Sequence, residues 1–132
     1  MTTYETKTIS ISIERDWRDV YEFAAEPRNF PRWASGLGSD YERVGEAWRA
    51  QGPEGPVRIW FTPPNELGVV DQRVVTASGA EILVPMRVMA NGTGAEVAFT
   101  LFRQPEMSAE IFARDAAWVA RDLAALKALL EV

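Results

Sequence analysis

The segment at residues 107–132 constrains the fold most, because it contains no proline or glycine and repeats apolar residues at a helical spacing. Ser108 is placed to cap the first turn, and Glu110 puts negative charge at the positive end of the helix dipole. Met107 and Phe112 have the spacing of a hydrophobic staple. Such a helix is roughly 36 Å long at about 1.5 Å per residue, so its apolar stripe needs an equally long partner surface. The stripe consists of Phe112, Ala116, Val119, Leu123, Leu126 and Leu130.

The chain before this helix predicts that partner surface, because its patterns are typical of β-strands. Residues 6–14 alternate between apolar and polar side chains, with the three isoleucines on one face, which indicates a half-buried strand. Pro63-Pro64-Asn65 predicts a turn, and Asn91-Gly92 predicts a hairpin. Further strands are expected at residues 41–45, 48–51, 57–62, 67–76, 81–90 and 95–104.

Two short helices are predicted between the first strand and the rest of the sheet. Asp16 is placed as an N-cap, with Asp19 at the third helical position, and Pro27 ends the first helix. Residues 29–34 form the second helical piece, and residues 35–39 form a glycine-rich exit. The apolar sides of these helices consist of Trp17, Val20, Tyr21, Phe23, Ala24, Phe30 and Trp33.

Composition narrows the function classes. Residues 1–132 are expected to form a single domain. The net charge is -5 and the 14 basic residues are scattered, so no nucleic-acid partner is expected. No apolar run approaches the roughly 20 residues that span a bilayer, so no membrane insertion is expected. The first residues lack a secretory pattern, which favours a cytoplasmic protein.

The absence of cysteine and histidine excludes whole classes of chemistry. Thiol nucleophiles, disulfides, zinc sites and Ser-His or Cys-His pairs all require one of these residues. Any catalysis would depend on carboxylates, Tyr, Ser, Arg or water. The acidic residues show no dense cluster of metal ligands, so we expect no metal and no cofactor.

The order of strand, two short helices, several strands and one long helix resembles the SRPBCC group of the START-like superfamily, which includes polyketide cyclase/dehydrase-like and birch-pollen-allergen-like proteins. The resemblance covers essentially the whole chain. It implies the α+β helix-grip fold, in which a curved antiparallel sheet wraps around the C-terminal helix and leaves a cavity between them. It brings no catalytic motif. The residues that carry it are Ile9 to Glu14 with the helix at Asp16, Pro27-Arg28-Asn29-Phe30-Pro31-Arg32-Trp33, and Trp118, Asp122-Leu123 and Leu126-Lys127.

Strand pairing predicts which side chains face that cavity. If Ser78-Gly79 forms a two-residue turn, Asp71 lies opposite Met86 and Arg73 opposite Val84. This face is the more apolar one and should face the long helix, although a register shift of one residue would reverse every side chain. It contains Val69, Asp71, Arg73, Val75, Ile82, Val84, Met86 and Val88, and across the next hairpin Val97, Phe99, Leu101 and Arg103.

The charged residues on this face form the first candidate site. An odd register sum across the Pro63-Pro64 turn places Arg58 opposite Asp71 and Trp60 beside Val69. The result would be a buried Arg58–Asp71–Arg73 cluster with Trp60 and Phe99 nearby, and polar groups in an apolar cavity orient ligands. The alternative is a structural ion pair, or arginines at strand ends that extend to solvent.

Aromatic residues and the long helix supply further candidates. Trp33, Phe30, Tyr41 and Trp48 either line an entrance to the cavity or fill the space left by a curved sheet. Trp118 is expected to pack inward. Asp115 and Asp122 flank it, either as an acid and base or as a helix edge paired with Arg114 and Arg121. The predicted ligand-binding residues are therefore Trp33, Tyr41, Arg58, Trp60, Asp71, Arg73, Met86, Phe99 and Trp118.

These observations lead to three functional hypotheses. The first is binding of a small, largely apolar molecule by a monomer or homodimer, and the resemblance implies a lipid, a polyketide or an aromatic metabolite. The second is a polyketide cyclase or dehydratase in which Asp71 acts as the base and Arg58 or Arg73 stabilises an enolate. The third is a protein-interaction module like the heat-shock-protein activator homology domains, which would need a sealed cavity and an exposed apolar patch.

Overall fold

The long C-terminal helix is present as predicted. A computed structural model describes residues 1–35 and 40–132, and in it α3 spans Ala109–Leu130. Ser108 caps the helix, because its Oγ accepts a hydrogen bond from the backbone N–H of Ile111 at 3.2 Å. The buried residues of α3 are the six of the predicted stripe. No helix among the described residues is long and apolar enough to cross a bilayer.

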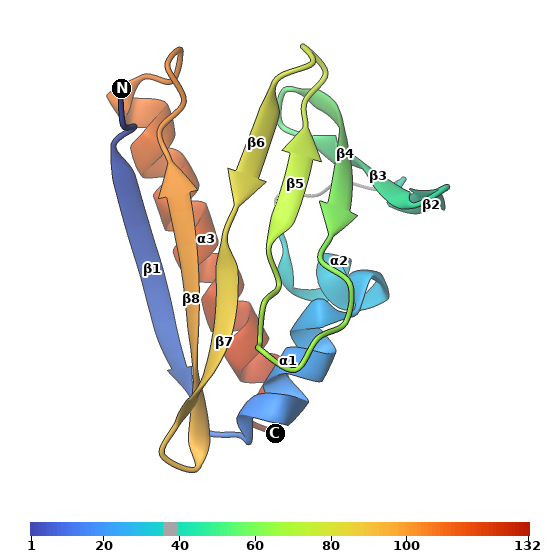
Figure 1. Ribbon diagram of the computed structural model, residues 1–132, viewed down its shortest axis with the longest axis vertical. Coiled ribbons are helices and arrows are strands. Elements are labelled where there is room, and N and C mark those ends of the chain that lie inside the picture. The colour runs from blue at the N-terminus through green and yellow to red at the C-terminus, as the bar shows by residue number, and fades with distance from the viewer. Residues whose placement is uncertain (36–39) are drawn as a thin grey trace.

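Two antiparallel sheets surround one side of α3 (Figure 1). The three-stranded sheet has the order β1-β8-β7, and the five-stranded sheet has the order β2-β3-β4-β5-β6. This arrangement confirms the predicted α+β helix-grip class. The strands are β1 Thr6–Ile13, β2 Glu42–Val44, β3 Ala47–Gly52, β4 Gly55–Phe61, β5 Gln72–Val75, β6 Glu81–Val84, β7 Met86–Asn91 and β8 Gly94–Phe102.

The two predicted strands at residues 67–76 and 81–90 are each divided between the sheets. Pro85 separates β6 from β7, because proline has no N–H to donate to a ladder. Residues 68–70 pair with β7, as the backbone bonds from Val88 N to Gly68 O and from Val70 N to Met86 O show. Farther along, β5 pairs with β4 and β6. Figure 1 shows the two sheets diverging toward the end of the molecule at which β6 begins.

The short helices follow β1 as predicted. The first, α1, spans Trp17–Ala25, and Asp16 caps it by accepting a hydrogen bond from the backbone N–H of Arg18. A 3-10 turn, η1 (Pro27–Asn29), leads into α2 (Phe30–Trp33). Most of the predicted glycine-rich exit, residues 36–39, lies outside the described residues.

The register between β5 and β6 differs from the prediction by one residue. Val84 lies opposite Gln72, not opposite Arg73. The reason is a three-residue loop at residues 77–79, where Gly79 has a φ of +87° and the Thr76 N–H donates to Ala80 O. The predicted inward face of β5 is therefore wrong: Gln72 and Val74 face α3, whereas Arg73 and Val75 face outward. The β6, β7 and β8 faces keep their predicted orientation. Each β7 residue pairs with a β8 residue two positions beyond the predicted one, and a shift of two leaves the same side chains facing inward.

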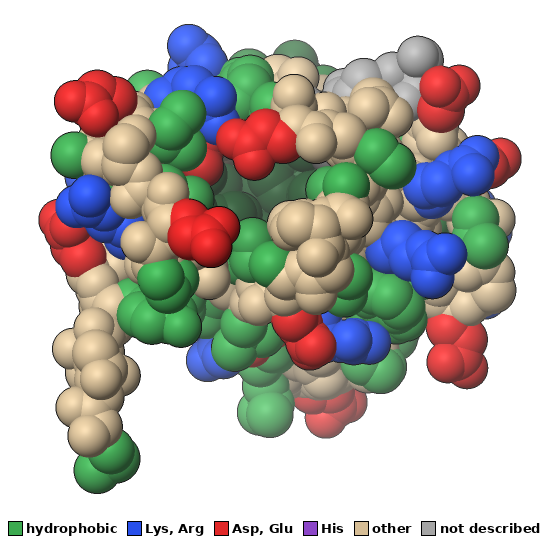
Figure 2. Space-filling view, turned by 90° about the horizontal axis from the view of Figure 1, so that it is seen from above, with side chains coloured by type: hydrophobic (Ala, Val, Ile, Leu, Met, Phe, Trp, Pro, Cys, Tyr) green, Lys and Arg blue, Asp and Glu red, His purple; other side chains and the backbone are tan. Residues whose placement is uncertain are grey.

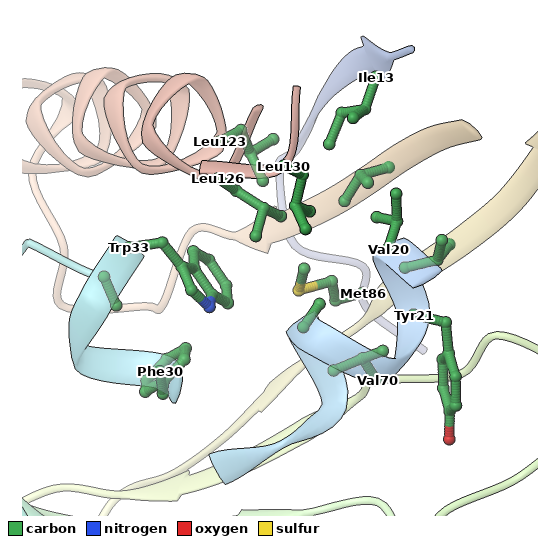
Figure 3. Close-up of a cluster of buried hydrophobic side chains, with 14 of the residues drawn as sticks. Ile13, Val20, Tyr21, Phe30, Trp33, Val70, Met86, Leu123, Leu126 and Leu130 are labelled. Carbon is green, nitrogen blue, oxygen red and sulfur yellow. The ribbon is translucent and has the colours of Figure 1, made fainter. Parts of the chain in front are cut away.

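The hydrophobic core lies where α1, α3 and the three-stranded sheet meet. Figure 3 shows side chains from all three pointing toward one another, with Met86 at the centre. We call this region the closed core. Its members, each at most 1% exposed, are Ile13, Val20, Ala24, Met86, Val88, Ala95, Val97, Leu123 and Leu126.

Replacing Gly68 by alanine should destabilise the junction between the sheets. A Cβ at Gly68 would lie 2.0 Å from the backbone oxygen of Val88, and Gly68 has a φ of +75°. Gly79→Ala is a matched control, because Gly79 also has a positive φ but its Cβ would meet nothing within 4 Å. Denaturant melts should give losses of about 2–5 kcal/mol for Gly68→Ala and about 1–2 kcal/mol for Gly79→Ala. Equal losses would contradict the close approach at Gly68.

Candidate functional site

The interior between α3 and the sheets opens away from the closed core. Strand alternation points several side chains toward α3 that are nevertheless only half-buried. A side chain between a sheet and a helix is otherwise excluded from solvent, so this partial exposure indicates open space. Figure 2 views the molecule from the end at which β6 begins and shows a hollow with hydrophobic side chains in its depth. The half-buried, inward-facing side chains are Val57, Phe61, Val74, Ile82, Val84, Phe99 and Leu101.

A cluster of aromatic rings connects α2 with β3 and β4. Phe30 packs edge-on against Trp33 at 5.0 Å and against Phe61 at 5.2 Å between ring centroids. Tyr41 stacks on Trp48 at 4.9 Å and lies 6.4 Å from Phe30. The predicted grouping of Phe30, Trp33, Tyr41 and Trp48 is therefore found. Phe61 was missed, because the predicted register placed Trp60 inward in its place.

The Tyr41 hydroxyl is fixed at the edge of this cluster. It donates a hydrogen bond of 2.7 Å to the backbone oxygen of Pro27. Burial raises the pKa of Tyr41 well above its ordinary value, and the negative charge of Glu26 adds to the rise. Tyr41 therefore remains a neutral donor and is poorly suited to act as a general base.

Two polar groups lie in the apolar interior. Gln72 is 3% exposed, and its Nε2 lies 3.8 Å from Met86 Sδ. The indole of Trp33 is 2% exposed, and its Nε1 is the one buried side-chain nitrogen or oxygen without a hydrogen-bond partner in the described part of the chain. Sequence reasoning missed Gln72, since the shifted register had placed it on the outer face.

The predicted buried Arg58–Asp71–Arg73 cluster does not form, because the register slip turns these residues outward and β4 pairs with β5 four positions away from the predicted register. Arg58 lies opposite Val75, and Trp60 lies opposite Arg73, on the outer face of the five-stranded sheet. There the Arg73 guanidinium lies 4.1 Å from the Trp60 ring centroid and 3.4 Å from Glu81.

Asp71 binds Arg87 instead of Arg58. Its Oδ1 accepts hydrogen bonds from the Met86 backbone N–H at 2.9 Å and from Arg87 Nε at 3.1 Å, and its Oδ2 accepts one from Arg87 Nη2 at 2.8 Å. Burial raises the pKa of Asp71, but the hydrogen bonds from Arg87 and Met86 outweigh it and hold that pKa below its usual value. This arrangement joins β7 to the start of β5.

The remaining charged candidates also have structural partners. Arg103 donates to Met107 O at 2.9 Å and pairs with Glu5 at 3.1 Å, which corresponds to the structural ion pair of the alternative interpretation. Asp115 pairs with Arg114 at 3.0 Å. Asp122 accepts hydrogen bonds from the Ser35 backbone N–H and hydroxyl at 3.0 and 2.6 Å. Among the described residues, no three Asp or Glu side chains gather as metal ligands.

Trp118 lies on the flank of α3, beside the buried stripe. Its ring is half-buried, and the Arg114 guanidinium lies 5.2 Å from the ring centroid. Arg114 also lies 3.9 Å from Glu54, in the turn between β3 and β4. This flank of α3 therefore faces the five-stranded sheet across the hollow.

Comparison with known proteins identifies the architecture. No protein-family model matches the sequence, and no curated protein matches it. The Aha1 dimer from Colwellia psychrerythraea matches with a TM-score of 0.74 at 16% identity, covering 97% of each chain. The chain has the helix-grip fold. Ara h 8.0201 matches it with a TM-score of 0.71 at 9% identity, covering 96% of this chain and 97% of that one.

A third helix-grip protein is DynU16, from the dynemicin biosynthetic locus. It matches with a TM-score of 0.69 at 17% identity over 96% of this chain, which spans 47% of the length of DynU16. The helix-grip fold that the sequence resemblance implied is thus confirmed. In a helix-grip chain, strand alternation decides which side chains face the interior. We therefore take the hollow, with the inward-facing side chains around it, and the aromatic cluster as the candidate site.

Asp71→Ala should destabilise the protein by about 1–3 kcal/mol at neutral pH, because the Met86 backbone N–H loses its acceptor and Met86 is 0% exposed. The folded protein holds the pKa of Asp71 down, so the stability that Asp71 contributes is present above the unfolded pKa of about 3.9 and is lost as the pH falls below it. Urea melts at several pH values should therefore show the gap between wild type and variant narrowing below about pH 4. Glu66→Ala, at an exposed carboxylate, is the control. A constant gap would contradict this account.

Proposed function

We propose that the protein binds a small, largely apolar molecule in the hollow between α3 and the five-stranded sheet. One observation supports this proposal above the others: side chains that face the helix stay partly exposed around the hollow, while the closed core excludes solvent. Concave, mostly apolar sites with few polar groups are typical of ligand pockets. The helix-grip likeness to DynU16, a protein of a biosynthetic locus, agrees with such a role.

Aromatic side chains favour an aromatic ligand among the three classes that the family resemblance implied. Rings arranged edge-on and stacked, as around Phe30 and Tyr41, present both edges and faces to a flat molecule. Of the residues predicted to bind ligand, four belong to the aromatic cluster, to α3 or to the inward face of the sheet outside the closed core: Trp33, Tyr41, Phe99 and Trp118. Met86 lies in the closed core. Phe61 and Gln72 join them in the proposed site.

The ligand is proposed to be uncharged. Arg58 and Arg73 lie on the outer face of the sheet, and Arg103 is bonded at the end of β8. A buried carboxylate would need a cation to offset the loss of its hydration. The acidic side chains at the rim of the hollow also disfavour an anion (Figure 2).

The alternative functions lack a comparable observation. The cyclase hypothesis needs Asp71, Arg58 and Arg73 in one place, and these side chains do not meet. The protein-interaction hypothesis needs a sealed interior, whereas Figure 2 shows an open one. Binding without catalysis is therefore the function we propose.

Val74→Phe should block the site. Val74 faces the hollow and is half-buried, so an added ring would occupy the space that a ligand takes. Titration with the neutral fluorophore N-phenyl-1-naphthylamine should show saturable 1:1 binding to wild type. The variant should bind about tenfold more weakly, a loss of about 1.4 kcal/mol.

Val75→Phe is the matched control, because the neighbouring Val75 is also half-buried but faces outward. It should leave the affinity within about twofold of wild type. Non-saturable binding to wild type, or equal affinities for the two variants, would contradict a site in the hollow. Thermal melts of both variants establish that they are folded.

A further inference from the structure

The indole N–H of Trp33 is set apart from the other buried polar groups on aromatic rings. Tyr41 donates its hydroxyl proton to Pro27 O, and the Tyr21 hydroxyl accepts a hydrogen bond of 2.7 Å from the Asn65 backbone N–H. Trp33 Nε1, which can only donate, has no acceptor among the described residues. Buried donors are nearly always hydrogen-bonded, and one that is left unpaired requires an explanation.

The surroundings of Trp33 hold the indole in place. The Ala34 backbone N–H closes α2 by donating to Phe30 O at 2.9 Å. Directly after it, Ser35 is tied to Asp122 of α3 by two hydrogen bonds. On the other side, the Phe30 ring packs edge-on against the indole. Because both neighbours are fixed, the donor is preorganised and cannot easily turn toward solvent.

Trp33 lies beside the closed core and packs against Phe30, whose ring contacts Phe61 at the hollow. Figure 3 shows its ring projecting from α2 into the interior, between Phe30 and Leu126 and on the side of Met86. Phe30 also contacts Phe61, a half-buried ring whose cross-strand partner is Gln72. The Gln72 carboxamide contacts Met86 as well. The indole and the carboxamide are therefore linked through the rings of Phe30 and Phe61.

We propose that Trp33 Nε1 donates a hydrogen bond to a carbonyl oxygen of the bound molecule, so that the ligand class is a neutral aromatic ketone or quinone. This inference rests on the proposed function. A carbonyl suits the indole because it accepts a hydrogen bond without bringing charge into the interior, from which Arg58 and Arg73 face away and at whose end Arg103 is already bonded. A flat ring system suits the edges of Phe30 and Phe61. Gln72 adds a second polar group for a further oxygen on the same molecule.

The test compares 9-fluorenone with fluorene, two tricyclic molecules of the same shape that differ in a carbonyl and a methylene group. Both should bind, and 9-fluorenone should bind about tenfold tighter, because only its oxygen pairs with the indole. In ¹H–¹⁵N spectra with assigned indole resonances, 9-fluorenone should move the Trp33 indole proton downfield. Fluorene should leave it near its free position.

Two variants test whether the preference for 9-fluorenone depends on the Trp33 indole N–H. Trp33→Phe keeps an aromatic ring without an N–H, so it should bind the two molecules with equal affinity. Trp60→Phe, on the outer face, should keep the tenfold preference. If Trp33→Phe does not fold, the indole spectra of the wild-type protein decide the question.

Each remaining outcome is informative. Equal binding of the two molecules by wild type, with no selective shift of the Trp33 indole, would overturn the carbonyl inference and leave the proposed function standing. Binding of neither molecule, together with no binding of N-phenyl-1-naphthylamine, would overturn both.

Discussion

The packing of the α3 stripe against β1 and β8 is the contact on which the rest of the structure depends. Six apolar side chains of α3 are buried, and four of them share one core cluster with Ile13 and Val97 of the three-stranded sheet: Val119, Leu123, Leu126 and Leu130. One helix is about 10 Å wide, so it cannot also cover a second sheet that diverges from the first. The five-stranded sheet is left facing the flank of α3 that carries Trp118. Aromatic side chains fill part of this space, and the hollow is what remains.

The elements that were predicted correctly have local signals. Ser108 and Asp16 cap their helices through hydrogen bonds to amides within three residues, and the α3 stripe follows from the helical period alone. The faces of β4 and β5 depend instead on the length of one loop. Ala77-Ser78-Gly79 fits either a two-residue turn or a three-residue loop that ends in a left-handed glycine. The second is found, and one residue of register reversed both strands.

That reversal explains which site residues the sequence missed and which it misplaced. Phe61 follows Trp60, and Gln72 precedes Arg73. The register error that placed Trp60 and Arg73 on the inward face therefore placed Phe61 and Gln72 on the outer one. The bidentate contact between Asp71 and Arg87 was missed for the same reason, because the predicted pairing placed residues 69–71 beside β7 but one residue out of register. The register error did not affect the prediction of the aromatic cluster to the same extent, because Phe30, Trp33 and Tyr41 lie outside the shifted strands.

The central claim is that ligand enters the open half of the interior and leaves the closed core intact. Methyl-resolved NMR during titration with N-phenyl-1-naphthylamine tests it most directly. We predict shifts at the inward methyl groups of Val74, Ile82 and Leu101. The outward Leu83 and the closed-core Leu126 should change little. Shifts confined to Leu83 and other outward methyl groups, or no shifts at any inward one, would contradict the account.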